Sequence, residues 1–486
     1  MDLKLVFRLL GMLGMAFSLV ILIPLIASFI IDQEHMIVFL GTLCISLVIS
    51  GIFLFYGARK TKQRLRIREA FAVVGCGWLM VCILGSLPYL LNGTMDPITA
   101  IFESVSGFTT TGVTTSKSFQ DFPVSILVWR CLTHWCGGIG VIMLFIIIMP
   151  QMNSGTGYLL NAEMPGSVIE HTLPRIKESA MLIFTIYVFL TAVEIILFIF
   201  GGVSVPQSIN LALATMATGG FSYYNDSLIS FNSVYVEIIA VVFMLISSIN
   251  FSLYYKIWRS DWTAIMEDAE HKYYLSLLAI AACLITIDLY WSGYFSSIMQ
   301  SARHGLFQAI SISTTTGFAS DDFNKWPSFS RFILLLLMFI GGCSGSTAGG
   351  IKIYRIIVLI KASWSELLRT LHPKIVYSIK IRNKPVEPEV VGSIMRFFFL
   401  YILVFMVLTI LISLTGLSLM DSIGVIAACL SSVGPAFSIV GPTTTYGDIS
   451  LFGRLISICA MLLGRLEIFT LLVIMRLAFW RNKQNW

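Results

Sequence analysis

Apolar residues dominate ten stretches of the chain, each long enough to cross a membrane as a helix. A transmembrane helix needs about 20 apolar residues, whereas a strand of a membrane barrel needs only about 10. The length of the stretches therefore predicts helices. The predicted spans are 9–31, 36–57, 70–91, 122–149, 177–201, 231–257, 273–295, 330–360, 391–416 and 449–480.

Four shorter apolar segments lie between these spans. Each has about 12 residues, which gives a helix of about 18 Å, too short for a hydrocarbon core of about 30 Å. A short apolar helix that ends in a polar turn is typical of a re-entrant segment, which enters and leaves the membrane on one side. The four segments are 97–108, 206–217, 301–314 and 421–432.

Each short segment is followed by a turn that contains glycine and hydroxyl residues. The turns are Phe108-Thr109-Thr110-Thr111-Gly112-Val113, Met216-Ala217-Thr218-Gly219-Gly220-Phe221, Ser313-Thr314-Thr315-Thr316-Gly317-Phe318 and Ser431-Ser432-Val433-Gly434-Pro435. Span, short helix, glycine turn and span therefore recur as one unit, which indicates an internal repeat. We predict an N-terminal helix pair with a basic loop (1–69) and four repeats (70–160, 161–260, 261–370 and 371–486).

Composition and charge support this membrane assignment. The chain is 57% hydrophobic and 12% charged, whereas soluble domains carry about 25% charged residues, so a water-soluble protein is excluded. If the N-terminus is cytoplasmic, most Lys and Arg residues fall in inner loops, and the outer loops hold only Lys117, Arg303, Lys325 and Arg331. We therefore predict that both termini are cytoplasmic. The net charge of +6 then reflects orientation in a lipid membrane and not nucleic-acid binding.

The four glycine turns are candidates for an ion filter. Each unit crosses the membrane an even number of times, so the units are parallel and their turns can meet on one pseudo-fourfold axis. Glycine allows backbone angles that aim carbonyls at this axis, and rings of carbonyls replace the hydration shell of a cation. The fold class is thus an all-α polytopic membrane protein with ten transmembrane helices and four parallel helix–pore-loop–helix repeats. The candidate filter residues are Thr110, Thr111, Gly112, Thr218, Gly219, Thr315, Thr316, Gly317, Val433 and Gly434.

The predicted span 330–360 contains a glycine-rich interruption at 341–350. Five glycines in ten residues disfavour a regular helix, and irregular backbone at membrane depth must face protein or a watery cavity. One interpretation is close packing of small residues; the other is an intramembrane loop beneath the filter. The second makes Gly345, Gly349, Gly350 and the adjacent Lys352 gate candidates.

Several polar residues lie within predicted apolar segments. Arg465 stands in the middle of the last span, either paired with an acid such as Glu467 or lining the pore below the filter. Glu103 and Glu194 are better explained as structural ties, and His134 as a packing residue. Their further roles stay open.

The four glycine turns, the broken helix and the extra N-terminal pair resemble the Trk/Ktr/HKT superfamily, within it the bacterial TrkH- and TrkG-like membrane subunits of potassium uptake. The resemblance covers essentially the full length. It implies K⁺ (and Rb⁺) as the cargo, the bacterial inner membrane, a homodimer with one pore per protomer, and a cytosolic TrkA-like nucleotide-binding ring. It also implies that the loop 341–350 obstructs the pore and that Arg465 takes part in gating. Only one glycine per turn matches the K⁺-channel TVGYG, which predicts a short filter.

Other function classes are less well supported. No P-loop and no clustered His, Cys, Asp or Glu set is visible, so we expect neither an enzyme nor a cofactor in this chain. A secondary carrier, such as a K⁺/H⁺ or K⁺/Na⁺ symporter, is the alternative, but carriers often show inverted rather than parallel repeats. The inner loop from Lys352 to Glu389 is strongly basic. It either serves only topology or contacts the cytosolic partner.

Overall fold

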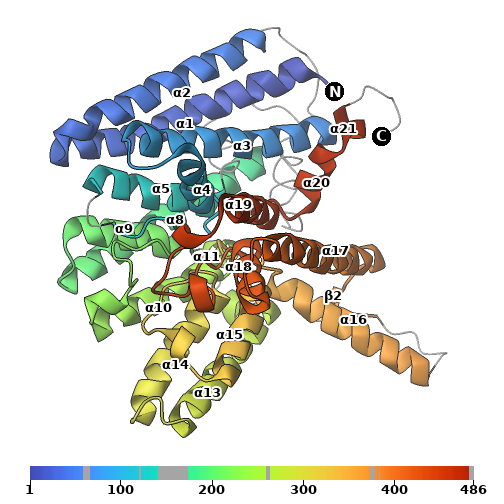
Figure 1. Cartoon of the computed structure of the whole chain (residues 1–486). Coiled ribbons are helices and arrows are strands. Elements are labelled where there is room, and N and C mark those ends of the chain that lie inside the picture. The colour runs from blue at the N-terminus through green and yellow to red at the C-terminus, as the bar shows by residue number, and fades with distance from the viewer. Residues whose placement is uncertain are drawn as a thin grey trace.

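The computed structural model describes residues 1–57, 66–119, 122–140, 173–258, 263–372, 378–381 and 384–480. Most of them are helical (Figure 1). The helices are α1 Leu3–Ile31, α2 Met36–Tyr56, α3 Ile67–Leu91, α4 Pro97–Phe108, α5 Val124–Ile139, α8 Leu173–Phe200, α9 Val205–Met216, α10 Val234–Ser248, α11 Phe251–Trp258, α12 Thr263–Glu267, α13 Ala269–Trp291, α14 Ile298–Ser313, α15 Ser328–Ile340, α16 Ile353–Leu371, α17 Pro388–Ser413, α18 Leu419–Ser431, α19 Leu451–Arg465, α20 Phe469–Met475 and α21 Leu477–Trp480. Two antiparallel strands of two residues each, β1 Lys380–Ile381 and β2 Lys384–Pro385, are a small exception to the all-α prediction.

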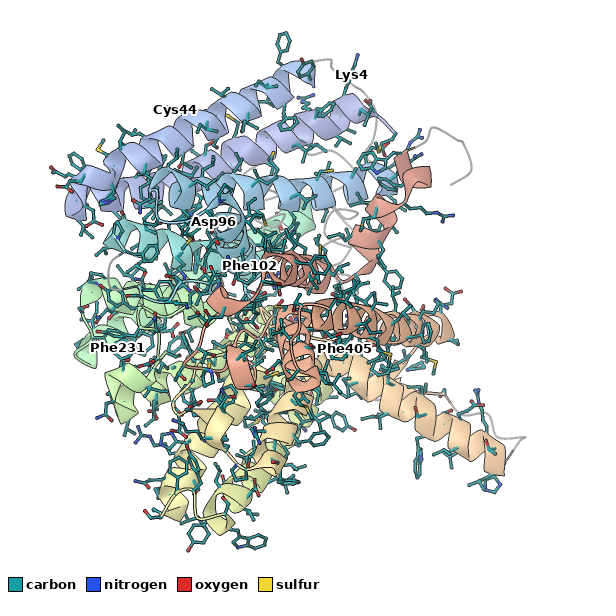
Figure 2. The ribbon with its side chains drawn as sticks, in the orientation of Figure 1. Lys4, Cys44, Asp96, Phe102, Phe231 and Phe405 are labelled. Carbon is teal, nitrogen blue, oxygen red and sulfur yellow. The ribbon has the colours of Figure 1, made fainter. Side chains whose placement is uncertain are left out.

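The N-terminal helices α1 and α2 pack along one edge of the molecule (Figure 1). Small residues make the close approach possible: the Ser18 and Ser46 hydroxyls lie 2.5 Å apart, and a side chain on Gly11 would collide with α2. Away from this seam the helices are apolar and exposed; Figure 2 shows Cys44 on the outer face of α2. Such a face is suited to contact with lipid.

Among the described residues, six helices are long and apolar enough to cross a membrane: α1, α2, α3, α8, α13 and α17. Two bent pairs, α10 with α11 (93°) and α19 with α20 (117°), raise this to eight if each pair is one span. The predicted continuous spans 231–257 and 449–480 are therefore wrong in detail, because the helix breaks at Ile249–Asn250 and again at Glu467–Ile468. The predicted span 122–149 begins with α5 and continues beyond the described residues.

The span predicted over 330–360 is also interrupted, here at the glycine-rich segment as the sequence indicated. Helix α15 ends at Ile340 and α16 begins at Ile353. Helix α16 then extends away from the bundle (Figure 1).

The four short helices α4, α9, α14 and α18 lie within three residues of their predicted limits. Polar residues define where they begin, since Asp96, Ser204, Ser297 and Ser418 occupy the N-cap positions. Each short helix also packs against a helix of the preceding unit: α9 on α5, α14 on α10, α18 on α15 and α4 on α19. These contacts run in cyclic order and place the C-terminal ends of the four short helices near one another.

Candidate functional site

The four segments that follow the short helices share one backbone path. We name them loop 1 (109–113), loop 2 (217–221), loop 3 (314–318) and loop 4 (431–435). In each loop one N–H donates to the carbonyl five residues earlier; the donors are Thr111, Gly219, Thr316 and Val433, at 2.9–3.0 Å. The residue before each donor has a left-handed conformation, with φ between 51° and 58°: Thr110, Thr218, Thr315 and Ser432. Threonine rarely adopts this conformation, which costs about 1–3 kcal/mol and persists only where packing enforces it.

The residue after each donor is a glycine with positive φ. These glycines are Gly112, Gly220, Gly317 and Gly434, with φ of 80°, 74°, 78° and 100°. The counterpart of Gly112 in loop 2 is therefore Gly220, and the prediction of Gly219 is off by one residue. Gly219 instead occupies the donor position that Thr111 has in loop 1.

The four loops contact one another in a closed ring. A Cβ atom added to any of the four glycines would lie closer than 3.0 Å to a carbonyl oxygen of a neighbouring loop, a separation that real side chains avoid. The pairs are Gly112 with the Gly219 carbonyl, Gly220 with Thr316, Gly317 with Val433, and Gly434 with Thr111. Glycine is thus required at these positions by space as well as by backbone angle.

The ring lies between two cavities. The four positive-φ glycines all border an outer cavity, which Arg130 and Tyr446 also line. An inner cavity of about 340 Å³ is lined by the glycine-rich segment, Arg465 and Ser432. The short helices end at the ring, so their partly negative C-terminal ends favour cations there.

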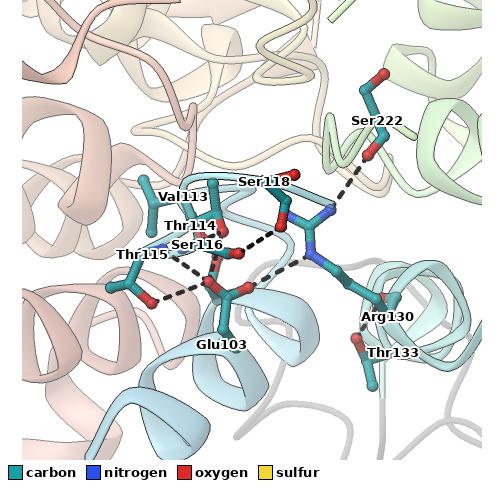
Figure 3. A network of polar contacts seen from close by, with 10 residues as sticks. Glu103, Val113, Thr114, Thr115, Ser116, Ser118, Arg130, Thr133 and Ser222 are labelled. Carbon is teal, nitrogen blue, oxygen red and sulfur yellow. Dashed lines mark hydrogen bonds and ion pairs between the residues drawn. The ribbon is translucent and has the colours of Figure 1, made fainter. Parts of the chain in front are cut away.

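An ion pair supports the outer side of the ring (Figure 3). Glu103 on α4 and Arg130 on α5 are both buried, with 3.4 Å between Oε2 and Nε. The other oxygen of Glu103 accepts hydrogen bonds from the Thr115 N–H and the Thr114 hydroxyl, just after loop 1. Arg130 donates to the Ser222 carbonyl, just after loop 2. The pair therefore holds two loops together, and Glu103 is the structural tie that we predicted.

The glycine-rich segment 341–350 contacts the inner side of the ring. The Gly349 N–H donates to the Thr315 hydroxyl at 2.7 Å, and the Thr347 and Thr218 hydroxyls are 3.3 Å apart. The N–H groups of Cys343 and Thr347 donate to the Ser248 and Ser247 carbonyls at the end of α10. These bonds show that the segment is docked under the loops and is not a helix–helix packing stripe.

Arg465 joins the same region from α19. Its guanidinium donates to the carbonyls of Gly137 and Gly138 at the end of α5, to the Thr347 carbonyl and to the Thr110 hydroxyl. The Lys352 ammonium donates to the Ala348 carbonyl. Gly345, Gly349, Gly350, Lys352 and Arg465 all line the inner cavity, so the structure brings the predicted gate residues together.

Two charged residues near the ring, Arg355 and Arg130, were not singled out from the sequence. Arg355 on α16 forms an ion pair with Glu467, the acid that we considered as a partner for Arg465. Arg130 lies within a predicted apolar span, which is the same signal that identified Arg465. Glu194 is fully buried on α8, and His134 lies against Gly219. No group of His, Cys, Asp and Glu suited to a metal ion occurs among the described residues.

Apolar helices around a ring of polar loops define a multi-pass membrane protein, and comparison with known proteins gives its family. The chain belongs to the TrkH family, described as cation transport proteins, whose model matches residues 35–482. It is 34% identical to the Trk system potassium uptake protein TrkH of Halomonas elongata over 486 residues, which cover 99% of this chain and 100% of the relative. It is 30% identical to TrkG of Escherichia coli (strain K12), with 97% of each chain covered. The crystal structure of the potassium transporter TrkH from Vibrio parahaemolyticus has a TM-score of 0.89 at 32% identity and covers 99% of this chain and 100% of that chain.

We expect Arg130→Met to lower the free energy of unfolding by about 3–5 kcal/mol, because it leaves the Glu103 carboxylate buried without its cation. Thermal unfolding of the detergent-solubilised protein measures the change. The double variant Arg130→Met/Glu103→Gln is the control, since it removes both charges, and it should be more stable than Arg130→Met alone. A double variant as unstable as the sum of the two single variants would contradict a direct ion pair.

Proposed function

We propose that this protein takes up potassium ions, and also Rb⁺, across the bacterial inner membrane through a K⁺-selective pore at the ring of glycine loops. The observation that carries the proposal is the cyclic contact of four loop carbonyls with four glycines. The names of the relatives as potassium uptake proteins support the same cargo.

The proposed arrangement is ten transmembrane helices, with the N-terminal pair (1–69) followed by four parallel repeats around a pseudo-fourfold pore. The cyclic order of helix contacts supports it. Both termini are proposed to be cytoplasmic. Helix α1 begins at the edge of the molecule where α21 lies (Figure 1), and Arg68 at the start of α3 donates to the Phe479 carbonyl of α21.

Selection would occur where carbonyl oxygens replace the water around the ion. The ring supplies backbone carbonyls from four loops, and the C-terminal ends of four short helices favour positive charge there. Thr110, Thr218, Thr315 and Ser432 follow on the inner side, where the first three bond to Arg465 or the segment 341–350 and Ser432 lines the inner cavity. A single glycine per loop makes this filter short.

The structure corresponds to a closed gate in this proposal. The segment 341–350 contacts loop 3 through Gly349, and Arg465 contacts loop 1 through Thr110. Both occupy the inner side of the ring, and Arg465 and Lys352 add positive charge to the exit path. Opening would move the segment into the inner cavity and release its bonds to the end of α10.

We also propose a homodimer and a cytosolic TrkA-like nucleotide-binding ring as partners, following the family resemblance. The basic segment from Lys352 to Glu389 is the proposed contact with this cytosolic nucleotide-binding partner. Helix α16, which forms the first half of this segment, extends from the bundle where a cytosolic partner could reach it (Figure 1).

Reversal potentials of the purified protein in planar bilayers test the proposed function. Under gradients of K⁺, Rb⁺, Na⁺ and pH, a K⁺-selective pore gives potentials that follow K⁺ and Rb⁺ alone. A potential that also follows the pH or Na⁺ gradient would indicate a symporter instead. Equal responses to K⁺ and Na⁺ would contradict the selective filter.

We expect Gly112→Ser, Gly220→Ser and Gly317→Ser each to lower the K⁺/Na⁺ permeability ratio by about tenfold, which corresponds to about 1.4 kcal/mol. A Cβ at these sites collides with a neighbouring carbonyl and disfavours the positive φ. Gly434→Ser should act in the same direction. Rb⁺ uptake competed by Na⁺, and growth of a K⁺-uptake-deficient strain on low K⁺, measure the effect. Gly202→Ser is the control, because Gly202 also has positive φ (81°) but has open space around a Cβ.

We expect Arg465→Ala to raise basal K⁺ flux about tenfold or more, because each lost charge-assisted hydrogen bond contributes about 1.5–3 kcal/mol to the closed state. Liposome flux at matched protein amounts measures this. Arg465→Lys keeps the positive charge but loses most of the guanidinium hydrogen bonds. A flux as low as that of the wild type would assign the effect to repulsion of the ion, and a raised flux would assign it to the lost hydrogen bonds. Deletion of several residues in 341–350 should likewise raise flux. An unchanged flux in both variants would leave these groups without a gating role.

We expect neutralisation of Lys374, Lys380, Arg382 and Lys384 to weaken capture of the cytosolic partner without changing the ion preference of the isolated pore. The loss of positive charge would remove attraction to an acidic surface on the cytosolic partner. Pull-down from solubilised membranes, with and without nucleotide, measures capture. Unchanged capture would mean that these charges serve only to orient the protein in the membrane.

A further inference from the structure

The ring of His134, on α5, occupies the space where loop 2 has no side chain. A Cβ added to Gly219 would lie closer than 3.0 Å to three atoms of the imidazole. Gly219 is the donor position of loop 2, where loops 1, 3 and 4 carry Thr111, Thr316 and Val433. Loop 2 is thus the one loop without a side chain at this position, and a side chain from another unit fills the gap.

The side chains at the donor position stabilise loops 1 and 3 from within. The Thr111 hydroxyl lies 2.8 Å from that of Thr109, and the Thr316 hydroxyl lies 2.9 Å from that of Thr314. Loop 2 has Ala217 and Gly219 at these two positions and cannot form such a pair. Two consecutive glycines, Gly219 and Gly220, also give its backbone more freedom than the other loops have.

His134 is the exception at its own position as well. It lies eleven residues after the N-cap of α5, and the residues eleven positions after the N-caps of α10, α15 and α19 are Met244, Met338 and Met461. All four side chains are fully buried. The helices that carry them pack in cyclic order on the short helices of the next unit. Each methionine therefore lies on a helix that packs against a short helix whose loop has a side chain at the donor position (Thr316, Val433 or Thr111). His134 lies on the helix that packs against α9, whose loop has Gly219 at that position.

His134 also belongs to a stack that fixes the outer half of loop 2. Its ring lies parallel to that of Phe221, with centroids 3.8 Å apart and 15° between the planes. The Arg130 guanidinium lies 3.4 Å from the Phe221 centroid, and Arg130 pairs with Glu103 (Figure 3). Side chains of the first unit, His134 and Arg130, therefore pack directly against loop 2.

We infer that His134 is a positioning residue for the second filter loop: it replaces the missing side chain at Gly219, and the pair determines how well the pore discriminates between cations. The inference rests on the proposed function of the ring as a filter. Because protein interiors are closely packed, the pair can change only together. Histidine at position 134 with glycine at 219 fills the space, and so does methionine at 134 with threonine at 219. Methionine with glycine leaves a gap, and histidine with threonine collides.

Reversal potentials of the purified variants His134→Met, Gly219→Thr and the double variant test the inference. Each single change should lower the K⁺/Na⁺ permeability ratio by about tenfold, because a gap or a collision beside loop 2 shifts its backbone. The double variant reproduces the combination found at α10 and loop 3, and it should recover most of the wild-type ratio. His304→Met is the control, because His304 also stacks on a phenylalanine, Phe295, but has no filter glycine among the contacts that the structure gives it.

The outcomes separate the inference from the proposed function. A wild-type protein without K⁺ preference would overturn the filter itself. A selective wild type with His134→Met unchanged, or with a double variant that shows the sum of the two single defects, would overturn only the pairing. If Gly219→Thr does not insert, Gly219→Ala replaces it, and recovery of membrane abundance by His134→Met in the double variant supports the steric pairing. Failure of that recovery contradicts it.

Discussion

The close approach of a loop carbonyl to the glycine of the preceding loop is the constraint on which the rest of the structure depends. It occurs four times. The series closes because the carbonyl that faces Gly434 of loop 4 belongs to Thr111 of loop 1. Four loops can approach this closely only if each has no side chain at that position and if its backbone can adopt positive φ. The short helices, the ion pair behind loop 1 and the packing behind loop 2 all serve to hold these four backbones in place.

The pairing of charged side chains around the ring follows from the membrane environment. A polar group at membrane depth must find a partner within the protein. On the outer side Arg130 joins loops 1 and 2 through Glu103 and the Ser222 carbonyl. On the inner side Arg465 donates to carbonyls at the end of α5 and of the segment 341–350. The first arrangement joins loops 1 and 2, whereas the second joins elements that the proposed opening would separate.

The sequence predicted the short helices well and their register less well. Helix α4 has the limits expected from its apolar length and its glycine turn, which are both local signals. Gly219 rather than Gly220 was matched to Gly112 because two adjacent glycines are equivalent in sequence, and the hydrogen bond from the Gly219 N–H distinguishes them. The break after α10 carries no proline or glycine; its terminal carbonyls instead accept from Cys343 and Thr347, a contact that no local pattern reveals.

The four loops share one backbone path but differ in their side chains, and the shared path explains how a few elements can contact several loops. Backbone symmetry places one left-handed residue of each loop on the inner side, so a single element beneath the ring can reach several of them. The segment 341–350 comes from the third unit, docks on α10 of the second and contacts Thr218 and Thr315. Arg465 of the fourth unit reaches Thr110 of the first and also the Thr347 carbonyl. A symmetric plug would need four copies of each contact, whereas here two elements from different units cover the ring, and because they bond to each other, displacing one weakens the hold of the other.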